Sequence, residues 1–102
     1  MNQDLIFQQI GQLSQIARNK GRSESEAASD AYNFVRGLLF RANELFKKYP
    51  TSNKDLLFHQ MSTQGLTLFH TNDNQEEILD LVSKSVSSYA DMSRSLAEEF
   101  SK

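Results

Sequence analysis

Residues 24–49 read ESEAASDAYNFVRGLLFRANELFKKY, and this stretch decides the fold class. Its apolar residues recur at alternating steps of three and four, the spacing of one face of an α-helix. The helix must end before Pro50, because a proline disfavours helical geometry in the residue that precedes it. We therefore predict a helix over about 24–48, with this apolar stripe: Ala28, Ala31, Val35, Leu38, Ala42, Leu45 and Tyr49, widened by Tyr32, Leu39 and Phe46.

Cap-forming residues mark where the predicted helices begin. Ser23 stands three residues before Glu26, which predicts a capping box, a reciprocal pair of side chain to backbone hydrogen bonds. Asp73 stands three residues before Glu76 and predicts a second start of the same kind. Between these two starts, a third helix has three cap-competent residues: Thr51, Ser52 and Asn53.

Three further amphipathic segments complete the chain, over about 4–17, 53–69 and 74–100. The first has the stripe Ile6, Ile10, Leu13, Ile16 and Ala17, widened by Met1 and Leu5, with Gln8, Gln9, Gln12 and Gln15 toward solvent. The second is the least regular and has the stripe Leu57, Phe58, Met61, Gly65, Leu68 and Phe69. The third is rich in serine and has the stripe Ile78, Val82, Tyr89, Met92, Leu96 and Phe100. In the second segment, Gly65 indicates either a bend or a close approach to another helix.

Four amphipathic helices with short connections predict an all-α fold, an antiparallel up-down-up-down four-helix bundle. The 102 residues suit one domain over 1–102, and the four glycines and one proline supply few turns for an all-β fold. We expect the four stripes to face inward and to close one core. No apolar run approaches the ~20 residues of a membrane helix, and no signal peptide follows Met1, so we expect a cytoplasmic protein.

Sites for catalysis, cofactors and metals are not expected from the residue types present. The chain has no cysteine, which excludes disulfides, thiolate zinc sites and cysteine nucleophiles. Its glycines are scattered singly, so no phosphate loop or dinucleotide fingerprint is present. On one unbroken helix His59 and His70 would lie about 16 Å apart, too far to share a metal ion. We expect that the protein is not an enzyme and holds no cofactor.

Several apolar residues lie outside the apolar stripes, at positions that are predicted to be exposed to solvent. They are candidates for partner contacts. Phe40 lies opposite Val35 and Leu38 on the helical wheel; it is either a lone exposed aromatic residue or a binding contact. Leu56 and Leu66 fall off the stripe of the third helix, unless that helix is bent. The candidate partner contacts are Phe40, Leu56, His59, Leu66 and His70.

Two stretches resemble the immunity proteins that protect lactic bacteria and streptococci from pediocin-like (enterocin A type) bacteriocins. One is Leu45-Phe46-Lys47-Lys48-Tyr49 before a turn that contains Pro50. The other is Gln75-Glu76-Glu77-Ile78-Leu79, similar to a Gln-Glu-Glu-Leu-Ile stretch that opens the fourth helix in that family. The size and the order of the helices are also similar. The long serine-rich helix up to Phe100 departs from the family, in which many members end in an irregular tail.

The resemblance implies a small cytoplasmic four-helix bundle that gives a producer cell protection against its own bacteriocin. Members of the family are understood to recognise the mannose phosphotransferase permease from inside the cell once bacteriocin has engaged it, and to block the pore. The C-terminal half is thought to choose which bacteriocin is resisted. The resemblance therefore implies a mechanism of binding without catalysis, with contact to the membrane only through a protein partner.

Two other functions stay open. The first is a helical adaptor, a chaperone or a partner-binding subunit of another system. The second is a nucleic-acid-associated regulator that uses Arg18, Lys20, Arg22, Arg36 and Arg41. Residues 1–54 hold eight Lys and Arg against five Asp and Glu, whereas residues 55–102 hold three against eight. That basic excess is small for a nucleic-acid binder, so we expect no nucleic acid as a partner.

Overall fold

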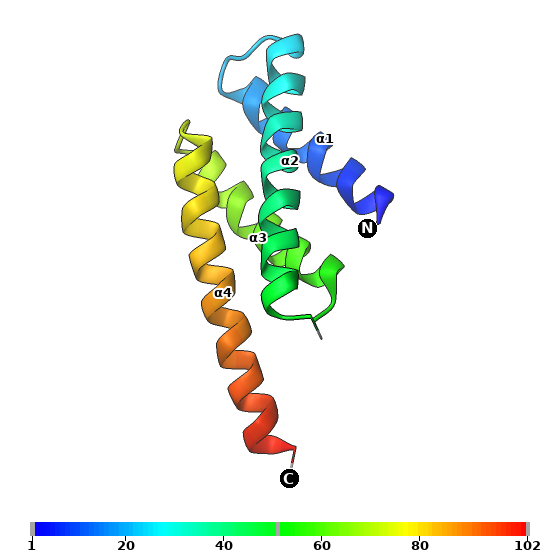
Figure 1. The fold of residues 1–102 in the computed structure, drawn as a ribbon. Helices are drawn as coiled ribbons and strands as arrows, with labels where there is room; N and C mark the ends of the chain where they lie inside the picture. The colour runs from blue at the N-terminus through cyan, green and yellow to red at the C-terminus, as the bar shows by residue number, and fades with distance from the viewer. Residues whose placement is uncertain (1, 51, 102) are drawn as a thin grey trace.

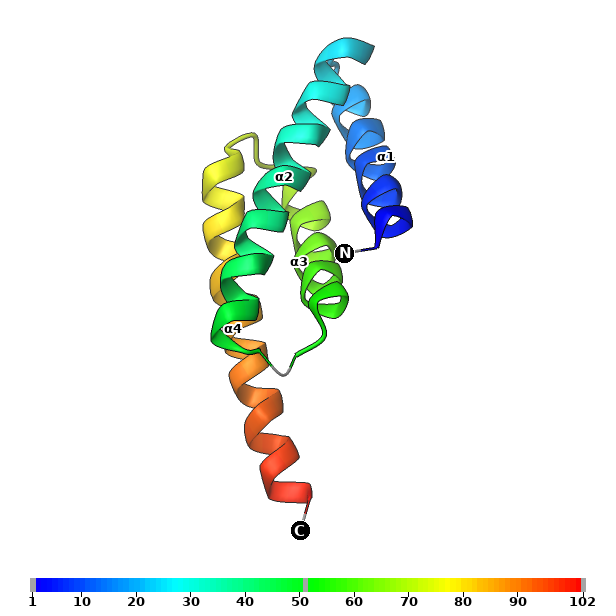
Figure 2. The same ribbon diagram turned by 45° about the vertical axis from the view of Figure 1, so that its right-hand side comes forward.

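The computed structural model describes residues 2–50 and 52–101, and in these residues it contains four helices and no strand (Figure 1). The helices are α1 (Gln3–Asn19), α2 (Glu24–Lys48), α3 (Lys54–Phe69) and α4 (Gln75–Phe100). Their directions alternate along the chain, as Figures 1 and 2 show. The predicted all-α antiparallel bundle is therefore confirmed. Met1 and Thr51, which entered the predictions, lie outside the described residues.

Capping residues explain where the helices begin. The predicted box at α2 is present: Ser23 Oγ accepts from the Glu26 amide at 3.2 Å, and the Ser23 amide donates to Glu26 Oε1 at 3.1 Å. Helix α3 begins after Asn53, one of the three expected caps. The second predicted start was wrong by one residue, because Asn74 is the cap of α4 and accepts from the Glu77 amide at 3.1 Å.

The core is built around α2 and α3, which both contact α1 and α4. Phe34 of α2 and Phe58 of α3 are the largest fully buried side chains, and the rings of Phe34 and Phe69 lie 5.1 Å apart between centroids. At Gly65 an added Cβ would lie 3.0 Å from the Phe34 ring. Of the two roles predicted for Gly65, the structure therefore supports the close approach between helices.

Two details of the predicted stripes were wrong. In α2, Ala28 and Tyr32 are exposed, while Ala27 and Phe34 are buried, so the buried face is turned by about one residue from the prediction. In α1, Gln9 is buried rather than solvated. It precedes Leu13 by four residues and therefore lies on the same face of the helix. The prediction placed it toward solvent because its side chain is polar.

Helix α4 is shifted along α2, so that its C-terminal part extends beyond the other helices. The side chain of Leu79 lies against Gly37, and the Tyr49 hydroxyl donates to Asp91. In both pairs the α4 residue is 42 positions after its α2 partner, so Asp91 lies beside the end of α2. Phe100 comes nine residues after Asp91 and therefore lies about 14 Å beyond the end of α2, at 1.5 Å per residue. Figures 1 and 2 show this free end, and the molecule measures 54 × 25 × 19 Å.

The shift of α4 overturns the expectation that all four stripes are buried. Ile78 and Val82 are buried as predicted. Tyr89 is 45% exposed beside the start of α3. The remaining residues of the predicted stripe are more than half exposed, because they lie past the end of α2: Met92, Leu96 and Phe100. Every residue from 91 to 101 is exposed. One core is closed by α1, α2, α3 and the first half of α4.

Candidate interaction surface

Four large apolar side chains form an exposed row on the second half of α4, which we call the α4 terminal face. The exposed fractions are 45% for Tyr89, 58% for Met92, 55% for Leu96 and 77% for Phe100. Their spacing of three, four and four residues places them on one side of the helix. Single exposed apolar residues are ordinary, but a contiguous group is typical of a binding surface.

A groove between the start of α3 and the middle of α4 continues this face. It has a volume of about 490 Å³, and its walls include Leu56 and Leu57 of α3 with Val86, Tyr89 and Ala90 of α4. Leu56 is more than half exposed. Since Tyr89 belongs both to the groove and to the α4 terminal face, the two form one apolar surface.

Tyr49 fixes α4 where this surface begins. The ring is buried, and its hydroxyl donates to Asp91 Oδ1 at 2.6 Å and lies 3.3 Å from Ser87 Oγ. Arg94 donates to the same carboxylate at 3.0 Å, and its guanidinium carbon lies 5.3 Å from the centroid of the Tyr49 ring. The side of α4 that carries Asp91 and Arg94 therefore faces the end of α2. The apolar side of α4 consequently points away from α2.

The predicted contact Phe40 lies on the outer face of α2. It is exposed, as its place on the helical wheel predicted, and the guanidinium carbon of Arg36 lies 5.3 Å from the centroid of its ring. A shallow hollow of about 410 Å³ beside it includes Phe46, Lys47 and Lys54. Phe40 does not line the groove next to the α4 terminal face.

The four candidate contacts on α3 are not brought together. Leu56 is exposed as predicted and joins the groove, and His59 is exposed one turn later. Leu66 was expected off the stripe, but it is partly buried and packs against the core. His70, also exposed, caps the far end of α3, about 21 Å from Leu56 at 1.5 Å per residue. Leu56 instead lies next to α4.

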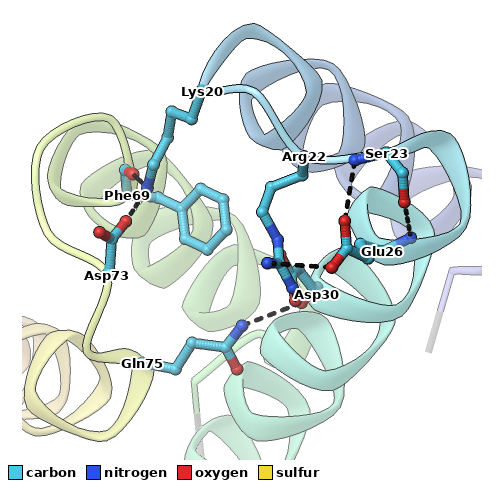
Figure 3. A network of polar contacts seen from close by, with 8 residues as sticks. All are labelled: Lys20, Arg22, Ser23, Glu26, Asp30, Phe69, Asp73 and Gln75. Carbon is cyan, nitrogen blue, oxygen red and sulfur yellow. Dashed lines mark hydrogen bonds and ion pairs between the residues drawn. The ribbon is translucent and has the colours of Figure 1, made fainter.

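A polar cavity of about 380 Å³ lies at the opposite end of the bundle, where the α1–α2 and α3–α4 connections meet (Figure 3). Lys20 Nζ donates to the Phe69 carbonyl at 2.7 Å and lies 2.6 Å from Asp73 Oδ1. Arg22 Nε lies 2.8 Å from Asp30 Oδ2, and Gln75 Nε2 donates to the Asp30 carbonyl at 3.1 Å. The charges in this cavity neutralise one another, so it joins two loops rather than presenting one sign of charge.

Hydrogen bonds and nearby positive charges lower the pKa of two acidic groups in the same region. The hydrogen bond from Lys20 and its positive charge lower the pKa of Asp73 from its ordinary value of 3.8. Hydrogen bonds from the backbone and side chain of Ser23, with the nearby charge of Arg22, lower the pKa of Glu26 from 4.5. Both carboxyl groups are therefore held in the ionised form that their partners require.

Three of the five cations considered for nucleic acid are engaged with carboxylates. Lys20 pairs with Asp73, Arg22 pairs with Asp30, and Arg41 lies 2.6 Å from Asp80. A cation held this way neutralises a carboxylate of its own chain, so it is less available to a phosphate. These pairs weaken the basis for the nucleic-acid function.

Within residues 2–50 and 52–101, no three His, Cys, Asp or Glu side chains gather to hold a metal ion. None of the helices in this described part combines the length and the apolar character needed to cross a membrane. We found no match for the chain among protein-family models, curated proteins or solved structures.

The residues of the α4 terminal face were missed because the stripe pattern assigned them to the core. A partial signal was available in the lengths of the helices. Helix α4 has 26 residues and α3 has 16, about 39 and 24 Å at 1.5 Å per residue. Helix α3 therefore cannot cover the whole of α4. Helix α2, with 25 residues, is long enough to do so, and only its shift relative to α4 leaves the end of the stripe exposed.

Proposed function

We propose that this protein acts by binding a protein partner through the α4 terminal face, without catalysis. The observation that carries the proposal is the apolar surface formed by Leu56, Tyr89, Met92, Leu96 and Phe100. Taking roughly 200 Å² for each large side chain and the exposed fractions above, the four residues of the α4 terminal face present about 500 Å² to solvent. Burying such an area in a partner is favourable at about 25 cal/mol per Å².

We further propose that the partner is the bacteriocin-engaged mannose phosphotransferase permease, and that binding from the cytoplasmic side gives a producer cell immunity. The resemblance of 45–49 and 75–79 to the pediocin-like immunity proteins supports this assignment. In that family the C-terminal half is thought to choose the bacteriocin. The α4 terminal face lies in the C-terminal half of this chain, which is consistent with the same role.

The chemistry of the face favours a helix or a helical hairpin as the structure it recognises. The apolar side chains form a straight row on a rigid helix, and the groove beside Leu56 can receive one further side chain from the partner. Leu96 and Phe100 lie in the freely accessible part, and we expect them to be the main anchors. Asp91 and Arg94 are engaged with Tyr49, so they hold the orientation of the helix.

The proposal is tested by expressing the protein in a strain that is sensitive to pediocin-like bacteriocins and measuring growth inhibition. We expect resistance to one bacteriocin. Phe100→Ser should abolish it, whereas Phe7→Ser should not, because Phe7 is equally exposed at 79% but lies on α1, which does not contact α4. The permease should copurify with the protein only when bacteriocin is present.

Two outcomes would contradict the immunity function. One is the absence of protection against every bacteriocin encoded beside the gene. The other is protection that persists in the Phe100→Ser variant, since the α4 terminal face would then not be the binding surface. A stable complex with a different, identified partner in cells that gain no protection would support the adaptor or chaperone function instead.

A further inference from the structure

Three of the four residues of the α4 terminal face, Tyr89, Leu96 and Phe100, belong to a longer heptad pattern. Residues spaced alternately by three and four lie along one seam of the helix: Leu79, Val82, Val86, Tyr89, Ser93, Leu96 and Phe100. This is the a/d pattern of a coiled coil. The first three are buried inside the bundle, whereas the last four lie on the free half of α4. The seam therefore continues past the point at which the bundle can cover it.

We propose that a second copy of this chain covers the free half of the seam, with its α4 antiparallel to the first. An antiparallel pair related by a two-fold axis places each a position opposite a d position of the other helix. Phe100 of one copy then lies opposite Tyr89 of the other, and Leu96 lies opposite Ser93. The large Leu96 side chain fits over the small serine, which lets the helices approach closely.

The charges on α4 are compatible with this arrangement. Asp91, Arg94 and Glu98 lie on the side of the helix opposite the seam, and the first two are engaged with Tyr49. Glu99 flanks the seam, but the antiparallel alignment places it beside Met92 of the other copy rather than beside another carboxylate. The proposed contact contains no pair of opposed like charges.

The groove supplies the ends of the interface. Tyr89, Ala90 and Ser93 form its α4 wall, and Leu56 lies on its α3 wall. Since Phe100 of the second copy lies opposite Tyr89, its ring reaches the mouth of this groove. The symmetry repeats the contact at the other end, so each copy inserts its terminal aromatic ring beside the α3 helix of the other.

The area decides what kind of dimer this is. Two apolar surfaces of about 500 Å² each would bury roughly 1,000 Å², the lower bound for a specific interface. We therefore expect a reversible dimer with a Kd on the order of micromolar. A membrane is the less suitable occupant, because helices that lie on membranes carry Lys and Arg on their polar side, and residues 91–101 hold three carboxylates against one arginine.

The dimer does not rest on the proposed function, because it concerns the purified chain alone. Both use the α4 terminal face, so a copy engaged in the dimer must dissociate before it binds another partner there. It is tested by sedimentation equilibrium over about 1–500 µM, a range that spans the expected Kd. We expect a monomer–dimer equilibrium that Leu96→Glu weakens by at least about tenfold. Phe100→Ser should act likewise, and Phe7→Ser should leave the equilibrium unchanged. A monomer at every concentration, or equal effects of Phe100→Ser and Phe7→Ser, would overturn the proposal.

The antiparallel arrangement has its own test. Because the chain has no cysteine of its own, only introduced cysteines can form disulfides. A Met92→Cys chain is mixed with a Glu99→Cys chain under oxidising conditions. The antiparallel seam brings these positions together across the interface, while each is farther from its own symmetry copy. We expect the mixed disulfide to exceed both homodimeric products. Statistical proportions of the three products would overturn this arrangement.

Discussion

A single hydroxyl group, that of Tyr49, joins the end of α2 to the middle of α4. It donates to Asp91 at 2.6 Å in a partly buried site. We expect Tyr49→Phe to lower the free energy of unfolding by about 1.5–3 kcal/mol, the range for hydrogen bonds to charged groups. Urea denaturation measures this change. Tyr32→Phe is the matched control, since Tyr32 is exposed on the same helix and should give no measurable change. Equal effects of the two substitutions would refute the role of the hydroxyl.

The pair of Lys20 and Asp73 makes stability depend on pH. Because Lys20 lowers the pKa of Asp73 in the folded state, the pair stabilises the fold above pH 3.8, the ordinary pKa of the carboxyl group. This contribution is lost as the pH falls through the lowered pKa. In Lys20→Met we expect the pKa of Asp73 to return toward 3.8, as measured by an NMR titration of the carboxyl carbon. An unchanged pKa would mean that Lys20 is not its cause.

At the scale of single helices, local sequence predicted most of what the structure contains. The span of α2 and its capping box follow from a stripe and a Ser–Glu pair that need no tertiary information. The start of α4 was misassigned because Asp73 and Asn74 are both good caps. Tertiary contact decided between them: Asp73 is engaged by Lys20 of another connection, which leaves Asn74 to cap the helix.

Two glycines within helices have opposite expected responses to alanine. Gly11 lies on α1 with open space around it, so Gly11→Ala should stabilise the protein by up to about 1 kcal/mol through helix propensity. Gly65→Ala gains the same propensity, but the added Cβ would lie 3.0 Å from the buried ring of Phe34. That crowding costs about 1–3 kcal/mol, so we expect net destabilisation. Thermal unfolding of both variants measures whether each substitution stabilises or destabilises the protein. Stabilisation by Gly65→Ala would show that the Phe34 ring can shift to make room for the added Cβ.

The relative shift of the helices could not be predicted from any one of them. A stripe states which side of a helix is apolar, but not how far along the neighbouring helix extends. The shift of α4 along α2 depends on particular pairs such as Leu79 with Gly37, which lie far apart in the sequence. For this reason the candidate site was predicted only in Leu56, while Tyr89, Met92, Leu96 and Phe100 were assigned to the core.

At the scale of the whole molecule, the protein has two parts that differ in burial. The bundle of α1, α2, α3 and the first half of α4 holds the buried core, and several of its charged residues pair within the chain. The free half of α4 adds no buried residue beyond Val86. A segment that contributes so little to the core and exposes so much apolar surface is consistent with the proposed binding function.

This division predicts that the chain can be shortened without unfolding. Removing residues 95–102 keeps Arg94 against Tyr49 and leaves every core residue in place. We expect the midpoint of thermal unfolding, measured at low protein concentration, to change by less than about 3 °C, because the described residues among those removed, 95–101, are all exposed. The same truncation should abolish dimerisation and bacteriocin protection, since it removes Leu96 and Phe100. A large loss of thermal stability would instead show that the end of α4 contributes to the stability of the fold. Retained protection would show that the binding surface lies elsewhere.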